Sequence, residues 1–212
     1  MAANNFTLNN NGLLLVLTGL PASGKDSVMK ALVDDEDLGF RRIVTYATRK
    51  AREGEINGVD HHFVSEESFH QIKKSGGLIE HVKTGTTWKG TPKEPFLNII
   101  QQNHRCIWRI DPFRSAKTKA LFHKHFGKVT GEQLYSKTVT IFINVTDKET
   151  LKKRWMERKK DEDTKQFEIR YRKDLEIFNK LRHKYDYIID NSGDIQKTIS
   201  EIKNIVKTVI SK

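Results

Sequence analysis

The stretch Gly19-Leu20-Pro21-Ala22-Ser23-Gly24-Lys25-Asp26-Ser27 directly follows the apolar run 13–17. Its spacing, G-x-x-x-x-G-K between a buried strand and a helix expected over 26–33, is typical of a loop that binds phosphate groups. The two glycines let successive backbone N–H groups point into one concavity, and the helix N-terminus adds partial positive charge. Lys25 can reach the β- and γ-phosphates of a nucleotide as a point charge. Residues 19–27 therefore predict a site for a nucleotide polyphosphate.

Asp26 is the unusual residue of this loop, because the position after the lysine commonly carries a Ser or Thr that binds magnesium. A carboxylate is a good oxygen ligand for Mg²⁺, although it repels phosphates when no metal is bound. We expect Mg²⁺ as the cofactor, with Asp26 as its ligand.

The composition describes one domain, or one domain with an inserted subdomain. The chain has 212 residues, of which 36% are hydrophobic and 31% charged, and its formal net charge is +11. The lysines are spread along amphipathic segments, so solvated helix faces and a polyphosphate site explain the charge better than a nucleic-acid interface does. We expect nucleotides as partners, and neither nucleic acid nor a membrane.

Two further features bear on the compartment. The longest apolar run, residues 13–17, is too short to span a membrane, and residues 1–6 lack the charged and apolar regions of a secretory signal. The one cysteine, Cys106, lies in an apolar run and cannot form an intramolecular disulfide. We therefore expect a cytoplasmic protein.

Strands and helices are expected to alternate along most of the chain. The expected strands are 13–17, 42–45, 61–64, 78–83, 105–110, 139–144 and 187–189, and the expected helices are 26–33, 66–74, 94–103, 115–126, 148–159, 166–184 and one around 195–206. This alternation predicts an α/β fold with a parallel sheet covered on both faces, with ligands at the carboxyl ends of its strands. Residues 46–91, which contain a turn region at 85–90, are expected to form an insertion, and the Asn-rich residues 1–11 a disordered extension.

Residues 48–64, T-R-K-A-R-E-G-E-I-N-G-V-D-H-H-F-V, form the longest motif of the chain. They resemble the signature T-R-x-x-R-x-G-E-x-x-G-x-x-Y-x-F-V of the guanylate kinases, with His61 in place of the tyrosine. Residues 78–80 (L-I-E), 90–92 (G-T-P) and 185–191 (Y-D-Y-I-I-D-N) resemble further segments of that family. The likeness extends over about residues 13–207.

The resemblance implies a fold and an activity. The fold is that of a P-loop kinase: three α/β/α layers with a central parallel sheet, an inserted nucleotide-monophosphate-binding subdomain and a helical lid. It implies a domain over 12–212, with a core of 12–45 and 92–212, the insertion at about 46–91 and the lid at about 154–170. The implied activity is the transfer of the γ-phosphoryl group of ATP to GMP or dGMP.

The resemblance also implies roles for residues around the acceptor. Arg49 and Arg52 can grip the acceptor phosphate, because a guanidinium binds phosphate bidentately. Glu80 is the base-reading residue, since a carboxylate accepts from guanine N1–H and N2–H₂ but meets an acceptor at N1 of adenine. The remaining residues implied at the GMP site are Thr45, Glu55, His61, Lys89, Thr91 and Asp111.

On the ATP side, the resemblance implies three lid arginines, Arg154, Arg158 and Arg170. Together with Lys25 they are the expected catalytic residues, because cations that converge on the transferring phosphoryl group neutralise its developing charge. Asn191 is expected to contact the edge of adenine.

Departures from the family pattern leave two alternatives open. Beside Asp26, His61 and Lys89 replace two tyrosines at the acceptor phosphate, and Arg109 replaces an acidic residue. The G-K-D-S run also occurs in ribose 1,5-bisphosphate phosphokinases. Glu80 and the intact signature from Arg52 to Glu55 argue against this alternative. A guanylate-kinase-like interaction module is the other alternative, since a fold does not fix a function.

Overall fold

The computed structural model describes residues 12–158 and 164–211, and its centre is a parallel sheet built around β1 (Leu13–Gly19). The strand order is β2-β7-β1-β8-β9, with all neighbours parallel. The other strands are β2 (Phe40–Arg42), β7 (Arg105–Arg109), β8 (Thr138–Asn144) and β9 (Tyr187–Asp190). All residues of β1 are buried, as is usual for a central strand of a parallel sheet that is covered on both faces.

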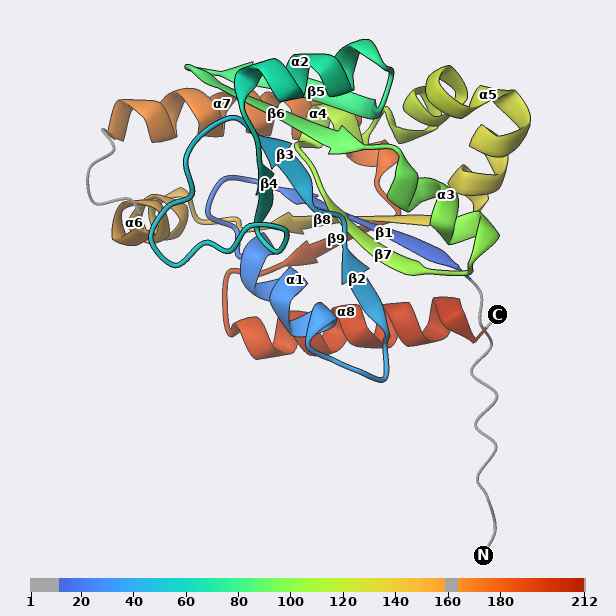
Figure 1. Ribbon diagram of the computed structural model, residues 1–212. Coiled ribbons are helices and arrows are strands. Elements are labelled where there is room, and N and C mark those ends of the chain that lie inside the picture. The colour runs from blue at the N-terminus through green and yellow to red at the C-terminus, as the bar shows by residue number, and fades with distance from the viewer. Residues whose placement is uncertain (1–11, 159–163, 212) are drawn as a thin grey trace, which may run out of the picture.

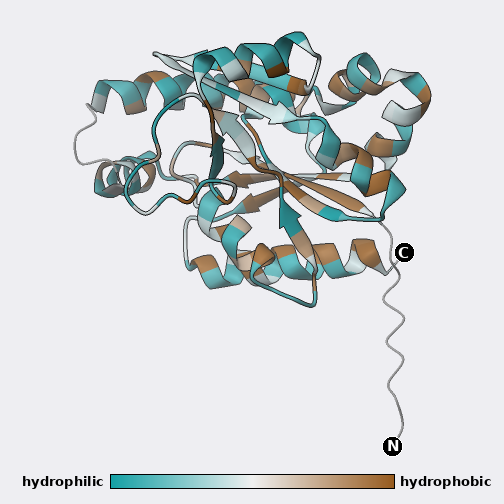
Figure 2. Ribbon diagram, in the orientation of Figure 1, coloured by the Kyte–Doolittle hydropathy of each residue, from teal (hydrophilic) through white to brown (hydrophobic). Residues whose placement is uncertain are grey.

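Alternate residues of β1 serve the two faces of the sheet. Leu13, Leu15 and Leu17 pack in a core with helices α1 (Lys25–Val33) and α8 (Ile195–Ile210). Leu14 and Val16 pack in a second core with α3 (Glu94–Gln101) and α5 (Thr118–Ser136). Figure 1 shows these helices on opposite sides of the sheet, and Figure 2 shows hydrophobic strands between them. The expected α/β fold with a parallel sheet covered on both faces is confirmed.

A third apolar cluster lies at the end of β8, and the two helices beside the phosphate loop pack against it. It joins Phe142 to α6 (Lys148–Arg158) and α7 (Thr164–Leu181) through side chains that include Trp155 and Phe167. Phe178 stacks on Phe142 with ring centroids 4.3 Å apart. The 3₁₀ helix η1 (Arg182–Lys184) then leads into β9.

A second sheet lies above the first, with the order β4-β3-β6-β5 (Figure 1). It consists of β3 (Thr45–Ala47), β4 (His61–Phe63), β5 (Leu78–Thr84) and β6 (Thr87–Pro92), and α2 (Glu66–Lys74) accompanies it. β3 and β4 are parallel, whereas β6 runs antiparallel to both β3 and β5. Gly90 allows close packing here, because a Cβ on it would lie 2.8 Å from Leu78 and 3.0 Å from Phe69.

The structure differs from the expected elements in three places. The turn region expected at 85–90 is wrong, since β6 occupies most of it and pairs with β5. The strand expected at 42–45 is two short strands, because the chain crosses there from the first sheet to the second. The helix expected at 115–126 is α4 (Pro112–Ser115) followed by the longer α5, which is kinked at Gly127. Among the described helices, none has the length and apolar character needed to cross a membrane.

Candidate active site

The phosphate loop leaves the carboxyl end of β1 and enters α1. Gly19 and Gly24 both have positive φ, 146° and 91°, and neither position has room for a side chain. A Cβ on Gly19 would lie 2.1 Å from the carbonyl oxygen of Ile143, and one on Gly24 would lie 2.4 Å from Nδ2 of Asn191. Glycine is therefore required at both positions by conformation and by close packing.

Lys25 is folded back onto this loop. Its Nζ donates to the carbonyl oxygens of Gly19 and Leu20 at 3.1 and 2.5 Å, and to Oγ of Ser23 at 3.2 Å. Burial is the main cause that lowers the pKa of Lys25 to about 7, and the nearby charges of Arg109 and Arg170 contribute to this shift. The ammonium thus occupies the concavity that the sequence assigns to phosphate, where an anion would stabilise its charged form.

Asn191 follows β9 and stabilises the phosphate loop by a hydrogen bond. Its Nδ2 donates to the carbonyl oxygen of Ser23 at 2.9 Å, and its Oδ1 accepts from Oγ1 of Thr198 at 2.9 Å. Its carbonyl oxygen accepts from Nη1 of Arg154 at 3.0 Å. From the sequence we expect Asn191 to contact adenine; the structure instead directs its buried side chain to the loop, because both ends of its amide are bound within the protein.

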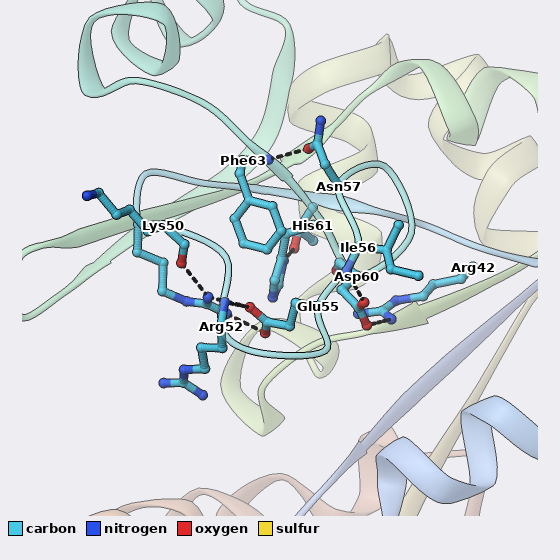
Figure 3. A network of polar contacts seen from close by, with 11 residues as sticks. Arg42, Lys50, Arg52, Glu55, Ile56, Asn57, Asp60, His61 and Phe63 are labelled. Atoms are coloured by element: carbon cyan, nitrogen blue, oxygen red, sulfur yellow. Dashed lines mark hydrogen bonds and ion pairs between the residues drawn. The ribbon is translucent and has the colours of Figure 1, made fainter.

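Glu55 holds together the loop between β3 and β4, residues 48–60, which we call the arginine loop (Figure 3). Its carboxylate accepts from Nη1 and Nη2 of Arg49 at 2.5 and 2.7 Å, and from the backbone N–H of Arg52 at 2.8 Å. The bonds from Arg49 are the main cause that lowers the pKa of Glu55 to about 2. From the sequence we expect Glu55 to belong to the GMP site. In the structure its oxygens hold Arg49 in position. The side chain of Arg52 extends away from this network (Figure 3).

His61 is the first residue of β4 and is almost fully buried. Its Nδ1 is 2.8 Å from Oγ1 of Thr45, in a hydrogen bond. Burial, together with the charges of Lys89, Arg49 and Arg42, lowers the pKa of His61 to about 4, so the ring is neutral at pH 7. Burial lowers the pKa of Lys89 to about 8, with Arg109 as the next cause.

Arg42 is a cleft residue that the sequence did not mark. Its Nη2 donates to the carbonyl oxygen of Asp60 at 2.9 Å, and its Nη1 lies 3.4 Å from Oδ1 of the same residue (Figure 3). Asp60 in turn accepts from the N–H of Ile56 at 2.9 Å through Oδ2. This pair connects the edge of the first sheet to the arginine loop. No local motif signals it, because Arg42 and Asp60 belong to different elements.

Glu80 and Asp111 are joined through Arg114, which the sequence also did not mark. Oε1 of Glu80 accepts from Oγ1 of Thr91 at 2.6 Å, and Oε2 lies 3.2 Å from Nε of Arg114. Nη1 of Arg114 donates to Oδ2 of Asp111 at 2.6 Å. Burial raises the pKa of Glu80. The signal available in the sequence was spacing, since an arginine three residues after a helix-capping aspartate can turn back to it.

A cleft of about 1200 Å³ joins the phosphate loop to the arginine loop. Most of the predicted site residues line it: Pro21, Ala22, Ser23, Gly24, Lys25, Asp26, Ser27, Arg49, Arg52, Glu55, His61, Lys89, Arg154, Arg170 and Asn191. Thr45, Glu80, Thr91 and Asp111 do not line it. Thr91 lies two residues from Lys89 on β6, on the same face of that strand, so the Glu80 cluster adjoins the cleft.

Asp26 and Arg109, two departures from the family pattern, contact each other. Nε of Arg109 lies 2.9 Å from Oδ1 of Asp26, and both side chains line the cleft. Arg109 ends β7 opposite Leu17 of β1, which places it beside the start of the phosphate loop. The inverted charge at position 109 is thus matched by the acidic residue at position 26.

The helices α6 and α7 bring two further arginines to the cleft. Arg154 is bound to Asn191, as described above, and Nε of Arg170 lies 3.7 Å from Oδ2 of the buried Asp174. Arg158 is the last residue of α6, but its side chain lies outside the described part of the chain, as do residues 159–163 of the expected lid.

Comparisons with known proteins agree with this geometry. The guanylate kinase family model matches residues 11–209. A guanylate kinase of Wolbachia pipientis wMel is 33% identical over 200 residues, which cover 94% of this chain and 92% of that protein. The guanylate kinase of Wolbachia sp. subsp. Brugia malayi (strain TRS) is 31% identical over 199 residues, 94% of each chain.

A solved structure matches in three dimensions as well. The crystal structure of guanylate kinase from Anaplasma phagocytophilum has a TM-score of 0.65 and 25% sequence identity, over 95% of this chain and 87% of that chain. The family model matches nearly the whole of this chain, and the two relatives and the solved structure match over most of both chains. The chain belongs to the guanylate kinase family, which are nucleoside monophosphate kinases.

Proposed function

We propose that this protein transfers the γ-phosphoryl group of ATP to GMP or dGMP within the cleft between its two sheets. The observation that carries the proposal is that Lys25, on the donor loop, lines the same cleft as Arg49, Arg52 and Lys89 on the acceptor side. Phosphoryl transfer requires two phosphate chains in line, held by positive charge. One cleft lined from both ends by cations meets that requirement.

The residues divide between the two substrates. Residues 19–27, Lys25 among them, hold the ATP phosphates from the loop side, and Arg154 and Arg170 approach from α6 and α7. Asn191 belongs to the ATP side through the hydrogen bond by which it supports this loop. Arg49, held in place by Glu55, and Arg52 bind the phosphate of GMP, with Lys89 beside them and the neutral His61 able to offer one N–H. The insertion at about 46–91 and the lid at about 154–170, partly outside the described residues, keep these roles in the proposal.

In this proposal the guanine base binds at Glu80, Thr91, Asp111 and Arg114, which we call the Glu80 cluster. A base that donates N1–H and N2–H₂ to Glu80 replaces contacts which the carboxylate now makes with Thr91 and Arg114. Adenine presents an acceptor at N1, so it would bring an acceptor against the carboxylate in place of the donors of guanine, and such a mismatch discriminates strongly between bases. Thr45, Thr91 and Asp111 complete the proposed base site.

Asp26 suits a magnesium ion that is held mainly by substrate. Its carboxylate is half exposed in the cleft, and no cluster of three or more His, Cys, Asp or Glu side chains suited to a metal occurs among the described residues. Mg²⁺ commonly takes one or two protein carboxylates and completes its shell with water and phosphate oxygens, so a single aspartate fits it. When bound, the ion supplies charge neutralisation to the ATP phosphates.

No observation favours ribose 1,5-bisphosphate as the substrate or an interaction module without activity. The intact loop lysine and the cleft-lining arginines support an enzyme, and the buried Cys106 is in keeping with the reducing cytoplasm. The test is an ADP-release assay with GMP, dGMP, AMP, UMP, CMP and ribose 1,5-bisphosphate. We expect turnover with GMP and dGMP; turnover with ribose 1,5-bisphosphate alone, or with none of the six, would contradict the proposal.

A further inference from the structure

The ion pair between Asp26 and Arg109 involves Nε of the guanidinium and leaves the donors on Nη1 and Nη2 for another group. The ion pair joins Nε of Arg109 to Oδ1 of Asp26 at 2.9 Å, and no hydrogen bond from Nη1 or Nη2 to a residue in 12–158 or 164–211 accompanies it. Arg49 differs, because its Nη1 and Nη2 each already donate one hydrogen bond to Glu55. A guanidinium presents its donors as a planar fork that fits two oxygens of a phosphate. Arg109 therefore offers an open fork on the wall of the cleft.

Arg109 also stands between the donor and the acceptor sides. Its charge is the first electrostatic cause that lowers the pKa of Lys25 on the phosphate loop, and also of Lys89 on β6. It acts on Arg42 in the same way. Cations gathered around one point repel each other, and an anion at that point relieves the repulsion. The substrate group that lies between the two sides is the phosphoryl group in transfer.

We propose that Arg109 is a catalytic residue that binds the transferred phosphoryl group through Nη1 and Nη2, while Asp26 positions it through Nε. The inference rests on the proposed ATP-dependent transfer. In that step the bond from the γ-phosphorus to its bridging oxygen breaks and the electron pair leaves with ADP. An oxygen of the acceptor phosphate forms the new bond. Arg109 supplies positive charge and hydrogen-bond donors to this step and transfers no proton, since a guanidinium acts as a fixed cation in proteins.

The first test is the binding of ATP and ADP measured by calorimetry without GMP and with EDTA in place of magnesium. ATP carries the group that Arg109 is proposed to bind and ADP does not. We expect R109A to weaken ATP binding about tenfold, the usual effect of one lost charge-assisted hydrogen bond, and to change ADP binding less than about twofold. The control R182A removes an exposed arginine of η1 that does not line the cleft, and should change neither.

The second test addresses Asp26 as the positioning residue. The ratio of ATP to ADP affinity is measured for D26A, R109A and D26A/R109A. D26A should lower the ratio of ATP to ADP affinity when Arg109 is present. We expect this decrease to be at least about fivefold larger than the decrease that D26A causes in the R109A background. Equal effects of D26A in both backgrounds would overturn the positioning role.

Activity supplies the third measurement. R109A should lower kcat about 100-fold with a small change in the KM values, and R109K should recover only part of the loss, since an ammonium lacks the fork. The proposal would be overturned if R109A bound ATP and ADP as tightly as the unaltered protein does. It would also be overturned if R109A lost the same factor in affinity for ATP and for ADP. Because the binding test uses no acceptor, it remains decisive even if the acceptor is not GMP.

Discussion

Replacing Glu55 by Ala tests whether the carboxylate that holds Arg49 in position controls binding of the acceptor. The change removes two hydrogen bonds to Arg49 and one to the N–H of Arg52. Hydrogen bonds to charged groups contribute about 1.5–3 kcal/mol each when well shielded. The side chains of Arg49 and Glu55 are 17% and 21% exposed, so water and salt reduce the sum. We expect a net loss of about 2 kcal/mol in the positioning of Arg49.

That loss corresponds to a fall of about 30-fold in kcat/KM for GMP, expressed mainly in KM, while KM for ATP stays the same. The assay is steady-state ADP release at saturating ATP with GMP varied. The matched control is Glu53→Ala, which removes the same charge from an exposed side chain of the same loop. If Glu55→Ala and Glu53→Ala gave the same kcat/KM for GMP, the positioning role of Glu55 would be refuted.

Two further predictions concern pH and base selectivity. The pKa of His61 is about 4 in the folded protein and about 6.5 in the unfolded protein. Between these pH values the unfolded state binds a proton that the folded state does not bind. The free energy of unfolding is therefore highest above pH 6.5 and falls by about 3 kcal/mol as the pH drops towards 4. Urea unfolding at pH 7 and pH 4.5 should show a smaller loss for His61→Gln, and an identical loss would contradict this. Glu80→Gln should lower kcat/KM for GMP at least about tenfold without lowering that for AMP, and an unchanged GMP-to-AMP ratio would argue against Glu80 as the base reader.

The parts of the fold that follow from local pattern could be predicted from the sequence. The apolar run that begins β1 and the glycines after it required a buried strand and a tight loop, and both are present. The stripe of Ile199, Ile202 and Val206 placed α8 correctly against the sheet. β6 could not be predicted in the same way, because Thr87–Pro92 has no alternation of apolar residues and becomes a strand through its pairing with β5 and β3.

The candidate site was predictable where its residues belong to one motif, and not where they meet across the fold. Lys25, Arg49 and Arg52 line one cleft, as the motifs implied. The pairing of Asp26 with Arg109 depends on β1 and β7 being neighbours in the sheet, which no single segment encodes. Each residue alone is a departure from the family pattern; together they form one contact.

Formation of GDP from ATP and GMP is the most direct test of the central claim, measured for the unaltered protein and for Lys25→Ala. We expect the unaltered protein to form GDP and ADP in equal amounts. Lys25→Ala should lower the rate at least about 100-fold, the scale expected when one preorganised charge is removed from a transition state, while its urea unfolding remains cooperative. Absence of GDP with the unaltered protein, or an unchanged rate with Lys25→Ala, would contradict the account.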